Sequence, residues 1–266
     1  MTVPTLAVEQ YQYTDTGVLL NGDPPVPFFD VTSVDGLDGT PVSLSSLNQM
    51  GRDGGYADAA NEDLRTVTVE GTVYASVTAL ETYLNLLKAN FAPSASDQPF
   101  YFRHDDTATV KMVMGKALGF TYTKDTLRRI GSADAQFSIV CGDPRIYSST
   151  LSTMAVARAG NNTMALVGNR DTYPTFILNG PLTAPITITY GSFVITYTVT
   201  ITTGHSVTID TAAKTCIDDL GNNVRGNVTL SPVAKWPVFG PGNNLVALGS
   251  SSGTGNLTVN ARSAWR

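Results

Sequence analysis

The residues best suited to acid–base chemistry in this 266-residue sequence are two histidines and two adjacent aspartate pairs. His104 lies in FRHDD beside Asp105-Asp106, His205 lies in TTGHSV, and Asp218-Asp219 precedes LGNN. A hydrolase needs a nucleophile or a second carboxylate aimed at the same point, and neither GxSxG nor HExxH occurs. Neighbouring residues of a strand point to opposite faces, so each aspartate pair predicts a turn rather than the facing carboxylates of a glycosidase. We therefore expect no enzyme.

Metal and cofactor sites are not expected either. Cys141 and Cys216 each stand alone, without the CxxC or His-rich spacing of a zinc site, and predict two reduced thiols in strands. The oxygens of DDLGNN at 218–223 suit calcium, but their spacing matches no known calcium loop. The glycines at 51–55 and 240–244 lack the strand–loop–helix setting of a phosphate loop.

Two tryptophans, Trp236 and Trp265, are the candidates for carbohydrate binding. Trp236 opens WPVFGPGNNLVAL, in which Gly242-Asn243 predicts a turn with positive backbone dihedrals and Pro241 fixes the approach to it. An aromatic ring near a strand end packs against the core more often than it carries a sugar. We expect core packing for Trp236 and keep a sugar platform as the alternative.

The composition favours β-structure and excludes some partners. Charged residues make up only 15% of the chain, so much of the surface is Thr, Ser, Asn and Gly, or becomes buried in an assembly. The formal net charge is −5 and there is no basic cluster, which argues against binding nucleic acid through its phosphates. No apolar run approaches the ~18 residues of a membrane span, and the N-terminus lacks the pattern of a secretion signal.

The first half of the chain, residues 1–150, predicts a β-domain with one helix. In residues 65–74 valines alternate with Thr and Glu, which indicates a half-buried strand. A helix is expected at about 77–91 from one apolar stripe, with Thr78 and Glu81 as a capping box. The polar, glycine-bearing stretch 48–65 predicts a protruding loop or hairpin.

The second half, residues 151–266, predicts a sandwich of two antiparallel sheets. A polar bridge at 148–164 leads into it, followed by short alternating segments separated by turns. The clearest is a hairpin that turns at Gly191-Ser192.

Several segments, taken in order, resemble one family. They are GRDGG, RTVTVEGTV, LETYLNLLKANF, FSIVCGDPRIYS, YPTFILNGPLTAPI, SVTIDTAAKTC, WPVFGPGNNLVAL and a final ARSAW. Their order and spacing, above all C-x-DP-x-x-Y at 141–147 and W-x4-PGNN at 236–244, are similar to those of the distal tail proteins of long-tailed, non-contractile bacteriophages.

The resemblance implies an architectural protein of the virion tail, assembled in the host cytoplasm. It implies an N-terminal ring-forming β-domain and a C-terminal galectin-like sandwich. Six copies would close into a ring between the tail tube and the tip or baseplate, and the channel would pass DNA. The implied partners are the tail tube protein, the tape measure protein and the tail-tip hub or receptor-binding proteins, with neither cofactor nor metal. Arg52, Asp53 and Tyr56 become candidates for an arm between subunits, and a carbohydrate-binding host-recognition module is the alternative role.

Overall fold

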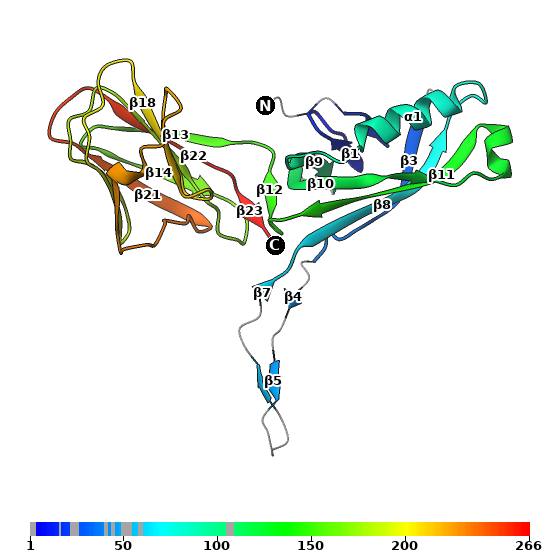
Figure 1. The fold of residues 1–266 in the computed structure, drawn as a ribbon, viewed down its shortest axis with the longest axis horizontal. Coiled ribbons are helices and arrows are strands. Elements are labelled where there is room, and N and C mark those ends of the chain that lie inside the picture. Colours follow the sequence, from blue (N-terminus) through cyan, green and yellow to red (C-terminus); the bar gives the residue numbers. More distant parts are fainter. Residues whose placement is uncertain are drawn as a thin grey trace. The chain divides into compact units, whose positions relative to one another are not determined.

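The chain folds into two compact units, Met1–Ser149 with Arg266, and Thr150–Trp265 (Figure 1). The structure is a computed structural model that describes residues 4–15, 17–21, 27–39, 42–43, 46–48, 55–57, 61–104 and 109–266. Both units are built mainly from antiparallel strands. In this part of the chain no helix is long and apolar enough to cross a membrane.

The first unit is organised around a sheet in the order β2-β1-β9-β10-β11-β8-β3, with β12 beside β10. Its strands are β1 (Gln10–Tyr13), β2 (Leu19–Leu20), β3 (Phe28–Asp35), β8 (Arg65–Tyr74), β9 (Gln98–Arg103), β10 (Lys111–Tyr122), β11 (Ser132–Cys141) and β12 (Ile146–Ser148). A short 3-10 helix, η1 (Thr126–Ile130), joins β10 to β11. In β8 the valines at 67, 69 and 73 are fully buried while Thr66 and Glu70 are exposed, as the alternation predicted.

The helix α1 (Leu80–Asn90) covers the core side of this sheet. The predicted stripe is confirmed, because Leu80, Tyr83, Leu84, Leu87 and Phe91 are all buried. Phe91 ties the helix to β11, since its ring stacks on that of Phe137 with centroids 3.8 Å apart. This aromatic contact anchors the end of the helix on the sheet.

The predicted capping box is wrong. The helix begins after Ala79, and no side chain caps it. Instead the backbone N–H groups of Ala79 and Leu80 donate to the carbonyl of Ser76. Glu81 pairs with Arg128 of η1, so tertiary contact recruits the carboxylate that local sequence assigned to the cap.

Within residues 42–62, the residues that the structure describes form two short antiparallel ladders, as the hairpin prediction for 48–65 implied. The strand β4 (Val42–Ser43) pairs with β7 (Asn61–Glu62), and β5 (Ser46–Asn48) pairs with β6 (Gly55–Ala57). We call this segment the arm. Tyr56 lies in β6 with Leu47 as its partner in register, whereas Arg52 and Asp53 lie outside the described residues.

The second unit consists of two five-stranded sheets that share one hydrophobic core. One sheet has the order β13-β22-β15-β18-β19 and the other β14-β21-β16-β17-β20, which is a sandwich-like arrangement. The strands are β13 (Ser152–Ala157), β14 (Asn161–Leu166), β15 (Thr175–Asn179), β16 (Ile186–Tyr190), β17 (Phe193–Tyr197), β18 (Ser206–Asp210), β19 (Thr215–Asp218), β20 (Val228–Ser231), β21 (Gly242–Gly249) and β22 (Asn256–Ala261). The short 3-10 helix η2 (Arg225–Asn227) precedes β20, and β23 (Ala264–Trp265) follows β22. The hairpin predicted at Gly191-Ser192 joins β16 to β17.

The polar bridge expected at 148–164 is wrong, because this stretch contains β13 and β14. Met154 and Val156 of β13, and Met164 and Leu166 of β14, point into the core of the second unit. Their outward neighbours are small or polar residues that hid the two-residue period.

Both cysteines are unpaired and buried, as predicted. Cys141 ends β11 and Cys216 lies in β19. Burial raises the pKa of Cys141 to about 12 and that of Cys216 to about 11. Both therefore stay protonated and unreactive at neutral pH.

Candidate functional site

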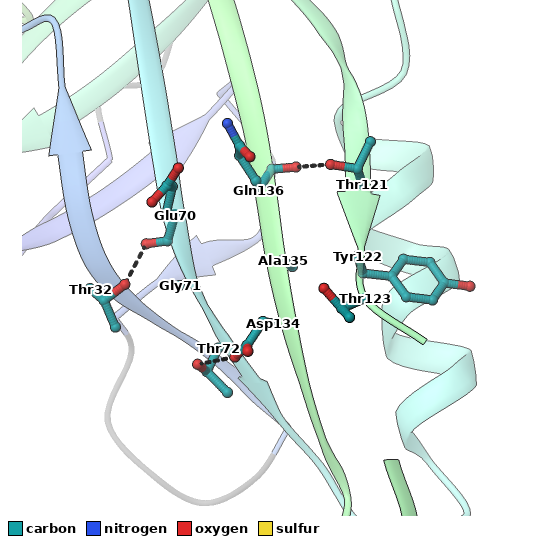
Figure 2. A pocket seen from close by; sticks show the side chains of 10 residues that line it. All are labelled: Thr32, Glu70, Gly71, Thr72, Thr121, Tyr122, Thr123, Asp134, Ala135 and Gln136. Carbon is teal, nitrogen blue, oxygen red and sulfur yellow. Dashed lines mark hydrogen bonds between the residues drawn. The ribbon is translucent and has the colours of Figure 1, made fainter. Parts of the chain in front are cut away.

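An open concavity of about 640 Å³ lies on the outer face of β3, β8, β11 and β10 (Figure 2). It lies on the opposite side of these strands from the buried valines of β8. Its lining includes Thr32, Glu70, Thr72, Thr121, Asp134 and Gln136. We call this surface the open face.

Strand register brings the polar residues of the open face together. Residues directly opposite one another on neighbouring strands share a face of the sheet. Three rows therefore run across β3, β8 and β11: Asp30–Thr72–Asp134, Ser33–Glu70–Gln136 and Asp35–Thr68–Ser138. Hydroxyl groups link the strands, since Thr72 Oγ1 donates to Asp134 Oδ1 at 2.8 Å and Thr121 Oγ1 donates to the carbonyl of Gln136 at 3.2 Å.

The open face is acidic. Asp30, Asp35, Glu70 and Asp134 all lie on it and are exposed. The residues that line the concavity include neither Lys, Arg nor His. Carboxylates spread over an open sheet create a negative potential that repels polyanions. This acidic surface was not predicted from the sequence, because its carboxylates come from three separate strands.

The root of the arm is held by a buried arginine. Arg65 is fully buried at the start of β8. Its guanidinium donates to the carbonyls of Pro144 at 2.7 Å and Gly36 at 2.5 Å, and to those of Leu37 and Gly39 at 3.2 Å each. Burial lowers the pKa of Arg65, yet the group stays protonated because its ordinary value is far above neutral. One side chain thus fixes the segment that leads into the arm and the turn after β11.

The other leg of the arm has its own contact with an arginine. Glu62 of β7 forms an ion pair with Arg266, whose Nε lies 3.2 Å from Glu62 Oε1. The outgoing leg is thus held through Gly36–Gly39 and the returning leg through Glu62. Both ends of the arm are tied to the first unit.

Trp236 packs against the core of the second unit, as expected. The guanidinium of Arg225 lies over its ring at 4.7 Å and also donates to the carbonyl of Val228 at 2.8 Å. A ring covered in this way presents little of that face to a sugar. Trp265 lies separately in β23 and is half-buried.

The turn after Trp236 is held by a buried amide. Gly242 has φ +96°, as predicted, whereas Asn243 does not share the positive φ and lies in β21. Asn244 Nδ2 donates to the carbonyls of Gly240 at 2.9 Å and Gly242 at 3.1 Å, and its Oδ1 accepts from Tyr190 at 2.9 Å. Asn244 therefore links the turn at 240–242 to Tyr190 in the β16–β17 hairpin.

His205 and the Asp218-Asp219 pair lie at strand ends and turns. His205 Nδ1 lies 2.9 Å from Asp219 Oδ2, beside a shallow concavity of about 250 Å³ in the second unit. Asp218 closes its own turn as predicted, accepting from the backbone of Leu220 and Asn222. Hydrogen bonds from the side chain and backbone of Asn222 lower the pKa of Asp218.

The other histidine lies in the first unit. His104 Nδ1 is 3.5 Å from Glu9, while Asp105 and Asp106 lie outside the described residues. Within the part of the chain that the structure describes, no group of three His, Cys, Asp or Glu side chains could hold a metal ion.

Comparison with known proteins finds similar solved structures. No family model matches the sequence, and no curated protein matches it significantly. The chain is similar to the crystal structure of the SPP1 Dit (gp 19.1) protein, described as a paradigm of the hub adsorption apparatus in phages that infect Gram-positive bacteria. The TM-score is 0.71 at 16% identity, over 98% of this chain and 100% of that chain.

Two baseplate structures show the same likeness at lower scores. The phage P2 baseplate in its activated conformation with Ca gives a TM-score of 0.55 at 8% identity, and the form with Sr gives 0.54 at 10%. Each alignment covers 96% of this chain and 98% of the other. The protein therefore shares its fold with phage hub and baseplate proteins.

Replacing Arg65 by Met will destabilise the first unit. The change leaves four carbonyls without their donor, and we expect a loss of about 3 kcal/mol in the free energy of unfolding. Urea unfolding followed by far-UV circular dichroism measures the loss. Both tryptophans lie in the second unit, so tryptophan emission follows that unit separately. The exposed Arg129→Met is the matched control, and a loss below about 1 kcal/mol for Arg65→Met would contradict the role given to Arg65.

Replacing Trp236 by Ala will lower the stability of the second unit by about 2 kcal/mol, because it removes core contact and the cation–π pair. Thermal unfolding by circular dichroism measures this, with Val233→Ala, 86% exposed in the same loop, as control. A Trp236→Ala protein that kept its stability but lost binding on a glycan array would refute the packing role and favour the sugar platform.

Proposed function

We propose that this protein is an architectural hub of a long, non-contractile phage tail. Six copies form a ring that joins the tail tube to the tip or baseplate and leaves a channel for DNA. The observation that carries the proposal is the shared fold with the SPP1 hub protein, which spans nearly the whole of both chains. Two units matched in one alignment are a stronger indication of a common role than either unit alone.

The features of the first unit suit a ring. A closed ring needs heterologous contacts, in which one surface of a copy meets a different surface of the next. The arm, held at both legs, is suited to reaching a neighbour in this way. Arg52, Asp53 and Tyr56 are the candidates for that contact, and a chain with only 15% charged residues has sides that can become interfaces.

The acidic open face suits a conduit. In the proposed ring this face lines the channel, where fixed negative charge keeps a polyanion from adhering. Six copies at −5 each give a formal charge of −30. The role is mechanical and electrostatic, with neither turnover nor cofactor.

We assign the second unit to a galectin-like sandwich at the periphery of the ring, which docks other tail components. The partners are the tail tube protein, the tape measure protein and the tail-tip hub or receptor-binding proteins. Assembly in the host cytoplasm and residence in the virion tail follow from this role.

The ring itself is tested with the purified full-length protein. Native mass spectrometry and negative-stain electron microscopy over a wide range of concentration should show hexamers and an annulus with a central hole. Monomer alone at every concentration, together with tails that assemble without the protein, would reject the proposal.

The conduit is tested by reversing charge on the open face. Rings of E70K/D134K should retain DNA in a gel-shift assay at low salt, whereas wild-type rings should not, because the lining loses its repulsion. The control D97K/D171K makes the same charge change at two exposed residues that do not line the concavity. If E70K/D134K rings bound DNA no better than control rings, the open face would not line the channel.

A further inference from the structure

Asparagine followed by glycine is a chemically labile dipeptide, and the sequence contains it twice, at Asn21-Gly22 and Asn179-Gly180. Loss of the amide begins when the backbone nitrogen of the next residue attacks Cγ of the asparagine. Ammonia leaves, a cyclic succinimide forms, and water opens the ring to aspartate or isoaspartate. Glycine permits the attack because it has no Cβ to obstruct it. Asn179 is therefore a candidate modification site in the second unit.

Packing of the second unit requires the glycine of this pair. A Cβ added at Gly180 would lie 2.1 Å from the carbonyl oxygen of Thr202 and 2.9 Å from Cγ2 of Ile201. The backbone N–H of Gly180 donates to the carbonyl of His205 at 2.9 Å. Glycine is selected where another segment of backbone approaches this closely. The labile dipeptide is thus a consequence of how the chain leaves β15.

The asparagine of the pair is held by its neighbours across the sheet. Asn179 is the last residue of β15 and lies opposite Asn256 of β22 on one side and Ser206 of β18 on the other. Its Nδ2 donates to Asn256 Oδ1 at 2.8 Å and to Thr258 Oγ1 at 3.1 Å. These bonds fix the direction of the side-chain amide in the folded unit.

The same contacts oppose the reaction. Attack requires the Gly180 nitrogen to give up its bond to His205, and the amide of Asn179 to turn away from Asn256 and Thr258. The central strand β15 is paired on both sides, so freeing its end requires the sheet to open. Regions that exchange only through such opening react at the rate of the open chain multiplied by the fraction open.

The isoaspartate product does not fit the folded unit. It routes the main chain through the former side chain and so adds a methylene between residues 179 and 180. The added length displaces Asn179 from its partners Asn256 and Ser206, or displaces Gly180 from His205. Conversion to isoaspartate is therefore a permanent change that refolding does not repair.

We propose that Asn179 is a latent deamidation site that the closed second unit protects, so that its conversion reports opening of that unit. Asn21 is the matched site in the first unit. It follows β2, a strand of two residues at the end of the described sheet, and its Nδ2 donates to the carbonyl of Glu9 at 2.9 Å. Short strands at a sheet margin open more readily than central ones, so Asn21 converts first in the folded protein. The inference does not depend on the proposed ring.

Peptide mapping by mass spectrometry tests the site in the full-length protein, incubated in mildly alkaline buffer with increasing guanidinium chloride. Folded protein should convert Asn179 at least about a hundredfold more slowly than unfolded protein. The rate should rise together with unfolding of the second unit, followed by tryptophan emission. In the unfolded chain Asn179 should convert at least about tenfold faster than Asn244, which precedes a leucine instead of a glycine.

A variant of the second unit separates opening of that unit from local mobility. Trp236→Ala should raise the rate at Asn179 in folded protein by tenfold for every ~1.4 kcal/mol of stability it removes, and leave the rate at Asn21 unchanged. The control Val233→Ala should change neither rate. Conversion of Asn179 in folded protein at a rate within about tenfold of the unfolded chain would overturn the inference. So would a rate that is independent of the stability of the second unit, or conversion of Asn179 before Asn21.

Discussion

The two-residue alternation of side chains along β8 and β11 is the constraint on which the first unit depends. One face of these strands carries Val67, Val69 and Phe137 into the core beneath α1. The other carries Glu70 and Asp134 into solvent. A slip of one residue in register would bury the carboxylates and expose the valines, at a prohibitive cost in free energy. Core packing therefore fixes the acidic face, and no ligand is needed to hold it.

Arg65 sets a second constraint, at the root of the arm. A buried cation is expensive to desolvate, and it is retained only where good hydrogen bonds offset that cost. Here the acceptors are backbone carbonyls from two separated segments, Gly36–Gly39 and Pro144. The Arg65 side chain thereby holds the segment before the arm close to the turn that follows β11. Combined with the Arg266–Glu62 pair, it fixes where both legs leave the sheet.

Much of the fold could be predicted from the sequence, but the open face could not. The alternation in residues 65–74 predicted β8, and the apolar stripe at about 77–91 predicted α1, because both signals are local in the sequence. The prediction of a capping box failed because Glu81 pairs instead with Arg128 of η1, which is distant in sequence. The strands at 148–164 were missed because their core residues alternate with small and polar neighbours. Asp30, Glu70 and Asp134 meet only through the register of three strands, which a single sequence does not reveal.

The acidic charge of the open face and the core of the first unit come from the same strands. Glu70 lies on β8 and Asp134 on β11, and each of these strands is paired on both sides in the sheet. Moving either carboxylate off the open face would require the register slip that exposes the valines of β8. In the proposed ring, the negative charge that repels DNA is therefore held by the packing of the core itself.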